Sequence, residues 1–324
     1  RTRTADGKSS VPRATLQFAG AAPTPQAPGI AVAGSVNELD LSAWLDLQRD
    51  MSERSPAAGA GTAALPGINT VAIKARNFAA IGRVFDDVSM NLRARGAGWE
   101  VVLSGAQMQG RIAWSPPKES GSRSGKLSGN FDRLLIPAAP PLAQTAAASK
   151  IPLRPNEFPA LEFSVRAFQI KERRLGSLTL QAFPEGNTWR ISNLSLSSPV
   201  AELKASGLWS GANETPGTGI EGSWQISDLG AFMDAMGYPA TIGGGQAELQ
   251  GRLAWAGAPI DFDAATLGGE LRLSAKSGRF LKADPGAGKL LSLISLQALP
   301  RRITLDFRDV FSEGFAFDAI KARV

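Results

Sequence analysis

The feature that most constrains how this chain can fold is a period-two alternation of apolar and polar residues along much of its length. In residues 71–76 every second side chain is apolar, and the others include Lys74 and Arg76. Residues 88–95 repeat the pattern, and a Gly-Ala-Gly turn leads directly into a further apolar segment at 99–103. Such alternation is typical of antiparallel strands with one apolar and one polar face. We therefore expect a mostly β protein.

The alternating pattern also recurs as a unit. Residues 71–115 align with residues 163–210 with few gaps, and Trp99 then falls on Trp189. Each unit closes on a strand that ends in tryptophan, and a third copy of that strand follows; these three residues are Trp114, Trp209 and Trp255. A recurrence at about ninety residues predicts tandem β-rich repeat units.

Four segments follow from these patterns. Short amphipathic helices are expected to begin at Asp40 and Asp228, because aspartate is a favourable N-cap residue. The predicted organisation is 1–67 (a β segment, a short helix and a flexible linker), 68–160 (the first β repeat with a Pro/Ala-rich linker), 161–219 (the second β repeat) and 220–324 (a C-terminal unit with helices at 228–237 and 289–299). The last segment should also contain strands at 269–275, 302–308 and 314–320.

The number of alternating segments limits the architecture. The sequence contains about fifteen to eighteen of them, whereas twisted open sheets rarely exceed about ten strands without curling or splitting. The sheet should therefore close into a barrel, pack against itself as a sandwich, or curl into a gutter. Because each repeat unit contacts its neighbours along the chain, an elongated, curled antiparallel sheet that forms a β-groove is favoured.

Composition narrows the classes of function. The chain has 324 residues, with 35 Gly and 21 Pro but no Cys and no His. Thiol nucleophiles, cysteine-ligated metal sites and a Ser-His-Asp triad are therefore excluded. We expect a protein that is not an enzyme and has no cofactor.

Charge and hydropathy bear on partners and compartment. The net charge of +6 is thinly spread, which suggests an ordinary surface with a mild bias towards anionic lipid and no nucleic-acid partner. No uninterrupted apolar stretch reaches the ~18 residues of a membrane span. The chain opens without Met in the middle of a pattern, so we expect a fragment whose targeting signals lie outside it.

Two local patterns suggest catalytic or phosphate chemistry, and simpler readings account for both. Residues 286–289 resemble part of a phosphate loop, but Ala283 and Leu290 stand where that loop needs Gly and Ser or Thr. A helix start explains this segment better. The carboxylates of 261–263 and 306–309 are candidates for acid–base or metal chemistry. Asp261 and Asp263 would share one face of a strand, which is the spacing of a solvent-facing strand edge.

The aromatic and helical features leave alternatives open. Trp114, Trp209 and Trp255 are either structural packing residues between units or interfacial anchors. The helices at 40–50 and 228–237 either cap the sheet or touch membrane. The helix predicted at 289–299 is apolar on most faces, so it is either buried or a membrane or lid helix; its apolar residues are Leu290, Leu291, Leu293, Ile294, Leu296 and Leu299.

The last hundred residues resemble a known family. The segments that carry the resemblance are 243–255, 259–263, 267–269, 278–281, 284–291, 299–302, 305–311 and 314–318. They are similar to the YhdP branch of the AsmA-like superfamily of bacterial envelope proteins, with the close match over about residues 220–324. The resemblance implies a fragment of a periplasmic, inner-membrane-anchored bridge that carries phospholipid toward the outer membrane of Gram-negative bacteria. Its implied partners are phospholipid acyl chains, with the membrane surface or other envelope proteins as further candidates.

Alternating apolar positions are the candidates for the lipid groove. They are Val71, Ile73, Val88, Met90, Leu92, Val101, Leu103, Phe163, Val165, Leu178, Leu180, Ile191, Leu194, Leu196, Leu271, Leu273, Ile303, Leu305 and Phe307. The same positions would serve equally as an ordinary sandwich core. Three functions thus remain: a lipid-transfer conduit, a structural or scaffolding module of the envelope, and a carbohydrate-active β-solenoid enzyme. Apolar alternation disfavours the enzyme, and the resemblance favours the conduit over the scaffold.

Overall fold

The structure is a computed structural model of the chain. The residues that it describes are 2–3, 9–10, 14–19, 29–41, 43, 68–117, 125–138, 154–156, 158–211, 217–259, 264–281 and 315–323. The predicted helix at 289–299, the predicted strand at 302–308 and residues 44–50 of the first predicted helix lie outside these described residues.

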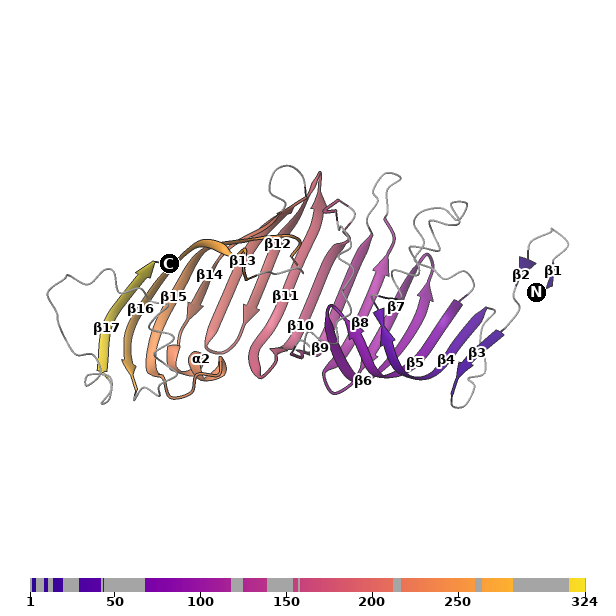
Figure 1. Ribbon diagram of the computed structural model, residues 1–324, viewed down its shortest axis with the longest axis horizontal. Helices are drawn as coiled ribbons and strands as arrows, with labels where there is room; N and C mark the ends of the chain where they lie inside the picture. Colours follow the sequence, from indigo (N-terminus) through magenta and orange to yellow (C-terminus); the bar gives the residue numbers. More distant parts are fainter. Residues whose placement is uncertain are drawn as a thin grey trace. The chain divides into compact units, whose positions relative to one another are not determined.

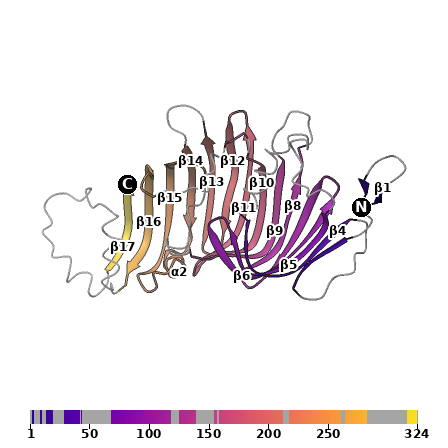
Figure 2. The ribbon, with the colours of Figure 1, turned by 45° about the vertical axis from the view of Figure 1, so that its right-hand side comes forward.

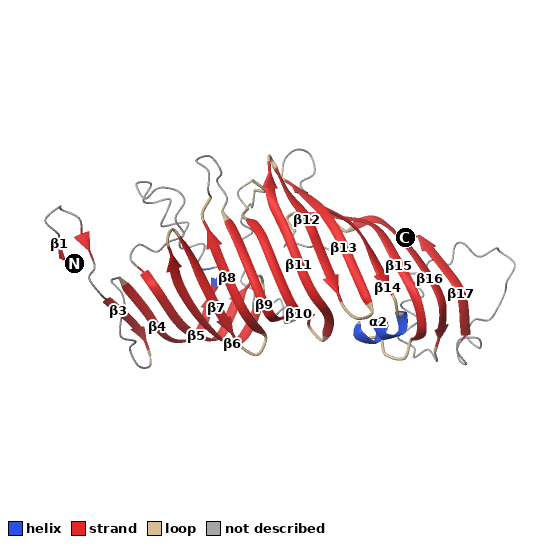
Figure 3. Ribbon diagram, turned by 180° about the vertical axis from the view of Figure 1, so that it is seen from behind, coloured by secondary structure: helices blue, strands red, loops and turns tan. Residues whose placement is uncertain are grey.

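The described chain is predominantly β-strand (Figures 1 and 3). The strands are β1 (Thr2–Arg3), β2 (Ser9–Ser10), β3 (Ala14–Phe18), β4 (Ile30–Asp40), β5 (Ile68–Ala80), β6 (Arg83–Arg95), β7 (Gly98–Ser104), β8 (Met108–Ser115), β9 (Lys126–Ile136), β10 (Ala160–Ile170), β11 (Arg173–Glu185), β12 (Thr188–Ser197), β13 (Ala201–Ser210), β14 (Gly217–Ile226), β15 (Ile242–Ala256), β16 (Gly268–Phe280) and β17 (Phe315–Arg323). Helix α2 (Leu229–Ala235) lies between β14 and β15.

The main sheet has fifteen strands in the order of the sequence, from β3 at one edge to β17 at the other, and β1 pairs separately with β2. The order is open, because β3 and β17 do not pair with each other. The strands bow along their length, so the sheet is curled (Figure 2). The expected mostly β, curled sheet is confirmed.

The first three strands of the sheet depart from the antiparallel expectation. Strand β3 pairs with β4 in parallel, and β4 also pairs with β5 in parallel. Where chain segments are joined by tight turns the strands are antiparallel, as at β5–β6 and β6–β7. Parallel neighbours need a long crossover connection, and residues 41–67 between β4 and β5 provide the length for one.

The repeat seen in the sequence is visible in the strands. Strands β5 to β8 correspond to β10 to β13, and equivalent tight turns contain Gly96 and Gly186, both with φ of 60°. Glycine adopts this left-handed conformation without a steric penalty. In the first copy Trp99 lies opposite Trp114, and in the second Trp189 lies opposite Trp209.

By its contacts the chain divides into two compact units, which we call the first unit (Arg1–Arg166) and the second unit (Ala167–Val324). The boundary does not coincide with the four predicted segments, whose limits remain a prediction.

Candidate functional site: the apolar faces of the two units

In the first unit, strand register gathers the alternating apolar residues on one face. Val71 lies opposite Leu92, which in turn lies opposite Val101. Ile73 lies opposite Met90 in the same way. The face also contains residues of the neighbouring strands, among them Leu103, Ile112, Phe131, Phe163 and Val165. Strand register therefore places the predicted alternating residues of this unit on one face, and their assignment to a lipid groove remains a prediction.

The first unit's apolar face has a buried side and a half-buried side. A buried layer is formed by Ala75, Val88, Leu103, Phe131 and Val165, each at most 5% exposed. Next to it, the side chains at the other end of the same strands are half-buried; they are Val71, Ile73, Met90, Leu92, Val101 and Ile112. The face is thus packed along one side and accessible along the other.

In the second unit the apolar face consists of layers that cross the strands β12 to β16. Adjacent strands place these residues directly opposite one another. The layers, in order along the strands, are Trp189, Trp209, Thr218 and Trp255; Ile191, Gly207, Ile220, Leu253 and Gly269; Leu194, Ala205, Gly222, Gly251 and Leu271; Leu196, Leu203, Trp224, Leu249 and Leu273; and Ala201, Ile226, Ala247 and Ala275.

The two outermost layers are buried, and the layers between them are mostly open. The tryptophan layer has exposures of 2% at Trp189, 2% at Trp209 and 8% at Trp255, and Thr218 is 1% exposed. At the opposite end, Ala201, Ile226, Ala247 and Ala275 are all below 10% exposed. Between the two, Ile191 on β12 is buried, at 4% exposed. The other large side chains there are half-buried, and we call them the open strip: Leu194, Leu196, Leu203, Ile220, Trp224, Leu249, Leu253, Leu271 and Leu273.

Contacts within the chain explain why the tryptophan layer is buried. The rings of Trp189 and Trp209 meet edge to face with centroids 6.4 Å apart. The indole Nε1 of Trp255 donates a 3.2 Å hydrogen bond to the carbonyl oxygen of Ala258, and Thr218 Oγ1 donates to that of Gly257. These contacts support the structural reading of the tryptophans in the second unit. The positions of Trp114, Trp209 and Trp255 near strand ends agree with the sequence prediction.

Helix α2 closes the other side of the open strip. Its predicted N-cap is confirmed, because Asp228 Oδ1 accepts a 3.0 Å hydrogen bond from the backbone N–H of Ala231. Its side chains Leu229, Phe232 and Met233 form one apolar cluster with the alanine-rich layer. The cap of the earlier predicted helix has the same form, since Asp40 Oδ1 accepts from the N–H of Ala43 at 3.3 Å.

The opposite face of the sheet carries the charges. In the second unit Glu221, Arg252 and Glu270 lie opposite one another on β14, β15 and β16. Lys204 and Glu202 form an exposed ion pair at 2.9 Å on β13. This alternation separates an apolar and a charged side of the same strands, as the period-two pattern requires.

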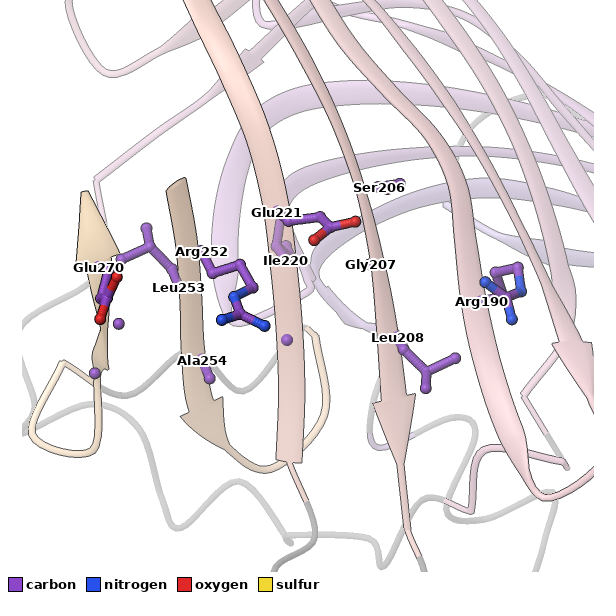
Figure 4. Close-up of a pocket in the computed structure, with 13 residues that line it drawn as sticks. Arg190, Ser206, Gly207, Leu208, Ile220, Glu221, Arg252, Leu253, Ala254 and Glu270 are labelled. Carbon is purple, nitrogen blue, oxygen red and sulfur yellow. The ribbon is translucent and has the colours of Figure 1, made fainter. Parts of the chain in front are cut away.

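Two shallow hollows of about 560 and 930 Å³ lie on this polar side of the second unit. Figure 4 shows the first, with Glu270, Arg252, Glu221 and Arg190 on successive strands across it and Leu208 on the strand between Glu221 and Arg190. Both hollows combine carboxylates with cationic and hydroxyl groups. The first is also lined by Leu208, Ala254 and two residues of the open strip, Ile220 and Leu253. The charged groups make both hollows poor candidates for an apolar ligand, whereas the face of the open strip carries no charged side chain.

Most predicted groove residues lie on these apolar faces. The exceptions are Ile303, Leu305 and Phe307, which lie outside the described residues together with the predicted lid residues of 290–299. Sequence reasoning missed several residues that complete the faces: Ile112, Phe131, Leu203, Ile220, Trp224, Leu249 and Leu253. Glycines interrupt the apolar alternation in their strands, which obscured the signal. Whether any of these residues touches lipid remains a prediction.

In the described part of the chain, no group of three or more acidic side chains is arranged to hold a metal ion. The acidic segments 261–263 and 306–309 and the glycine-rich segment 286–289 lie outside the described residues. Of the helices that the structure describes, none has the length and apolar character needed to cross a membrane.

The strand order is open, and in each unit the sheet has an apolar face and an opposite, polar face, which is consistent with a β-groove class of protein. The chain belongs to the YhdP protein family, whose model matches residues 1–324. It is 29% identical over 151 residues to the intermembrane phospholipid transporter YhdP of Escherichia coli (strain K12). That alignment covers 46% of this chain and 12% of the relative, so the chain corresponds to a small part of the relative's length. No solved structure matches the chain.

Proposed function

We propose that this chain is part of a periplasmic lipid-transfer bridge, anchored in the inner membrane by a segment outside it, in which the apolar faces shield phospholipid acyl chains between the two membranes. The observation that carries the proposal is the open strip of the second unit. Its leucines are half-buried and carry no charged neighbour on the same face. The Escherichia coli relative is an intermembrane phospholipid transporter, which supports the same conclusion.

The physical basis is the free energy of exposing hydrocarbon to water. Each methylene costs about 0.8 kcal/mol when it is transferred to water. Two chains of about fifteen carbons would therefore cost over ~20 kcal/mol, which an apolar surface largely removes. The phosphate headgroup needs no such shield and can stay in solvent. No reactive side chain is required, in keeping with a non-enzymatic role.

A structural scaffold is the alternative function. A scaffold predicts an apolar face fully covered by interlocked side chains, as found in the tryptophan layer. The open strip differs from that layer, because its side chains keep accessible surface. This difference favours the lipid conduit.

The test is whether lipid binds to the apolar face. The full chain is incubated with phosphatidylethanolamine and phosphatidylglycerol vesicles and re-isolated, and its organic extract is analysed by mass spectrometry. We expect bound phospholipid, and its loss in a triple variant with Leu92, Leu180 and Leu273 replaced by Asp. The matched control replaces Val102, Phe183 and Leu208 by Asp; these side chains are exposed on the opposite, polar face. Equal loading of both folded variants would contradict the proposal.

A further inference from the structure

The position of helix α2 bears on which lipids the second unit can bind, an inference that rests on the proposed function. We propose that α2 is a wall of the open strip and that Phe232 limits the thickness of the acyl chains that the strip accepts. The tryptophan layer forms the opposite wall.

The surface beneath α2 is built for close packing of a helix. Three of the four residues in the covered layer are alanines, at positions 201, 247 and 275, so the layer leaves room above it. On the helix side, Gly230 is buried, and a Cβ at this position would lie 2.7 Å from the carbonyl oxygen of Ile242. Small residues on both surfaces therefore let α2 sit directly on β15.

Hydrogen bonds hold α2 at both ends. The Asp228 cap fixes its first turn. At its C-terminal end, Arg173 Nε donates a 3.0 Å hydrogen bond to the carbonyl oxygen of Met236, which ties the helix to the start of β11. Asp234 Oδ1 accepts a 3.1 Å hydrogen bond from the N–H of Ala240, in the connection to β15. An element held at three points is suited to be a fixed boundary.

The helix side nearest the open strip is apolar. Phe232 and Met233 are half-buried, whereas Asp234 is exposed. The Phe232 ring meets Trp224 edge to face, with centroids 5.1 Å apart and an interplanar angle of 80°. Trp224 belongs to the first open layer beside the covered one. Phe232 therefore stands at the border between the covered layer and the open strip.

The two covered layers are eight residues apart along β15, from Ala247 to Trp255, which is about 26 Å at ~3.3 Å per residue. Between them the open layers extend from Leu249 to Leu253, over about 13 Å. Carbon atoms of adjacent chains approach to about 4 Å, so the open layers have room for at least two straight chains side by side, and the chain next to α2 would meet Phe232. Methyl branches thicken a chain, and the side chain at the border then decides whether it fits.

The experiment compares two lipids that differ only in their chains. The full chain is incubated with vesicles containing equal amounts of dipalmitoyl and diphytanoyl phosphatidylglycerol, and the ratio of bound lipids is measured by mass spectrometry. We expect wild type to prefer the straight-chain lipid several-fold. Phe232→Ala should shift the ratio several-fold towards the branched lipid, and Phe232→Leu should give an intermediate ratio. Leu208→Ala, on the opposite, polar face of the sheet, should leave the ratio of bound lipids unchanged.

The possible outcomes distinguish a failure of the proposal for α2 from a failure of the proposed function. If wild type and folded Phe232→Ala take up lipid with the same ratio of branched to straight chains, the proposed role of Phe232 is wrong, but the proposed lipid-transfer function still stands. Uptake of neither lipid by wild type would overturn the proposed function and the wall with it. Should Phe232→Ala unfold, Phe232→Trp replaces it and should strengthen the preference for straight chains; an unchanged ratio in that variant also overturns the wall.

Discussion

Arg190 Nε donates a 2.6 Å hydrogen bond to Glu185 Oε2 across the turn between β11 and β12. In the preceding repeat, Arg95 meets Glu100 at 3.2 Å across the equivalent turn between β6 and β7. The sequence separation is five residues in both pairs, but the order of the charges is reversed. The two repeats therefore share an ion pair at this turn without sharing the residues that make it.

Exchanging the charges of Glu185 and Arg190 should leave the stability of the chain nearly unchanged. Both side chains are about half exposed, and exposed pairs contribute about 0.2–1 kcal/mol. The single change Arg190→Glu should lower the free energy of unfolding by no more than this amount, and adding Glu185→Arg should restore it. Urea denaturation measures both values. A loss well above 1 kcal/mol that the exchange fails to restore would show that the pair does more than close the turn.

Trp209→Ala should be among the most destabilising single substitutions. The side chain is 2% exposed and contacts Trp189, and removing a buried aromatic ring costs about 3–5 kcal/mol. Trp209→Phe should retain a large part of that contribution. Trp99, which is half-buried in the first repeat, provides the matched comparison, and Trp99→Ala should cost less. Chemical denaturation of the three variants ranks them, and an equal cost at both positions would contradict the difference in burial.

Gly222→Ala and Gly219→Ala should differ in sign although both lie in β14. A Cβ at Gly222 would lie 2.5 Å from the carbonyl oxygen of Lys204 and 2.7 Å from Ala205 Cβ, so overpacking should cost about 1–3 kcal/mol. At Gly219 nothing lies within 4 Å of that Cβ. Alanine there should be neutral or stabilise by up to about 1 kcal/mol, through the entropy of the unfolded chain. Thermal melting compares the two variants, and equal melting temperatures would contradict this account of the close strand approach.

Asp228→Ala should destabilise helix α2 and its packing on the sheet. Loss of the cap to Ala231 costs about 1 kcal/mol, while Asp228→Asn keeps an accepting oxygen and should cost little. Denaturant melts measure the global effect, and hydrogen exchange at the amides of Phe232 and Met233 reports the helix itself. Faster exchange in the alanine variant alone is the expected result. Unchanged exchange would mean that packing, and not the cap, holds the helix.

The period-two pattern was sufficient to predict the apolar face. Val71, Leu92 and Leu273 were assigned to that face from alternation, and strand register places them there. The Asp228 cap and the strand-end tryptophans could also be predicted from the sequence, because each depends on a few neighbouring residues. Trp224 was missed, since it stands next to Gly222 and Gly219 in a strand whose alternation is broken by glycine. Gly222 is explained by its contacts with Lys204 and Ala205 on the neighbouring strand, which alternation does not reveal.

The sequence by itself determined which residues share a face, because side chains on a strand alternate every second residue whatever the partner strand is. Tertiary structure decided which parts of that face are buried and which stay open. Arg173 and Met236, which are 63 residues apart, are brought together by the sheet and fix α2 over the alanine layer. Tertiary structure also decided that β3, β4 and β5 run parallel. The reason is that strand register and helix docking depend on contacts between distant residues, whereas alternation is a local property of the chain.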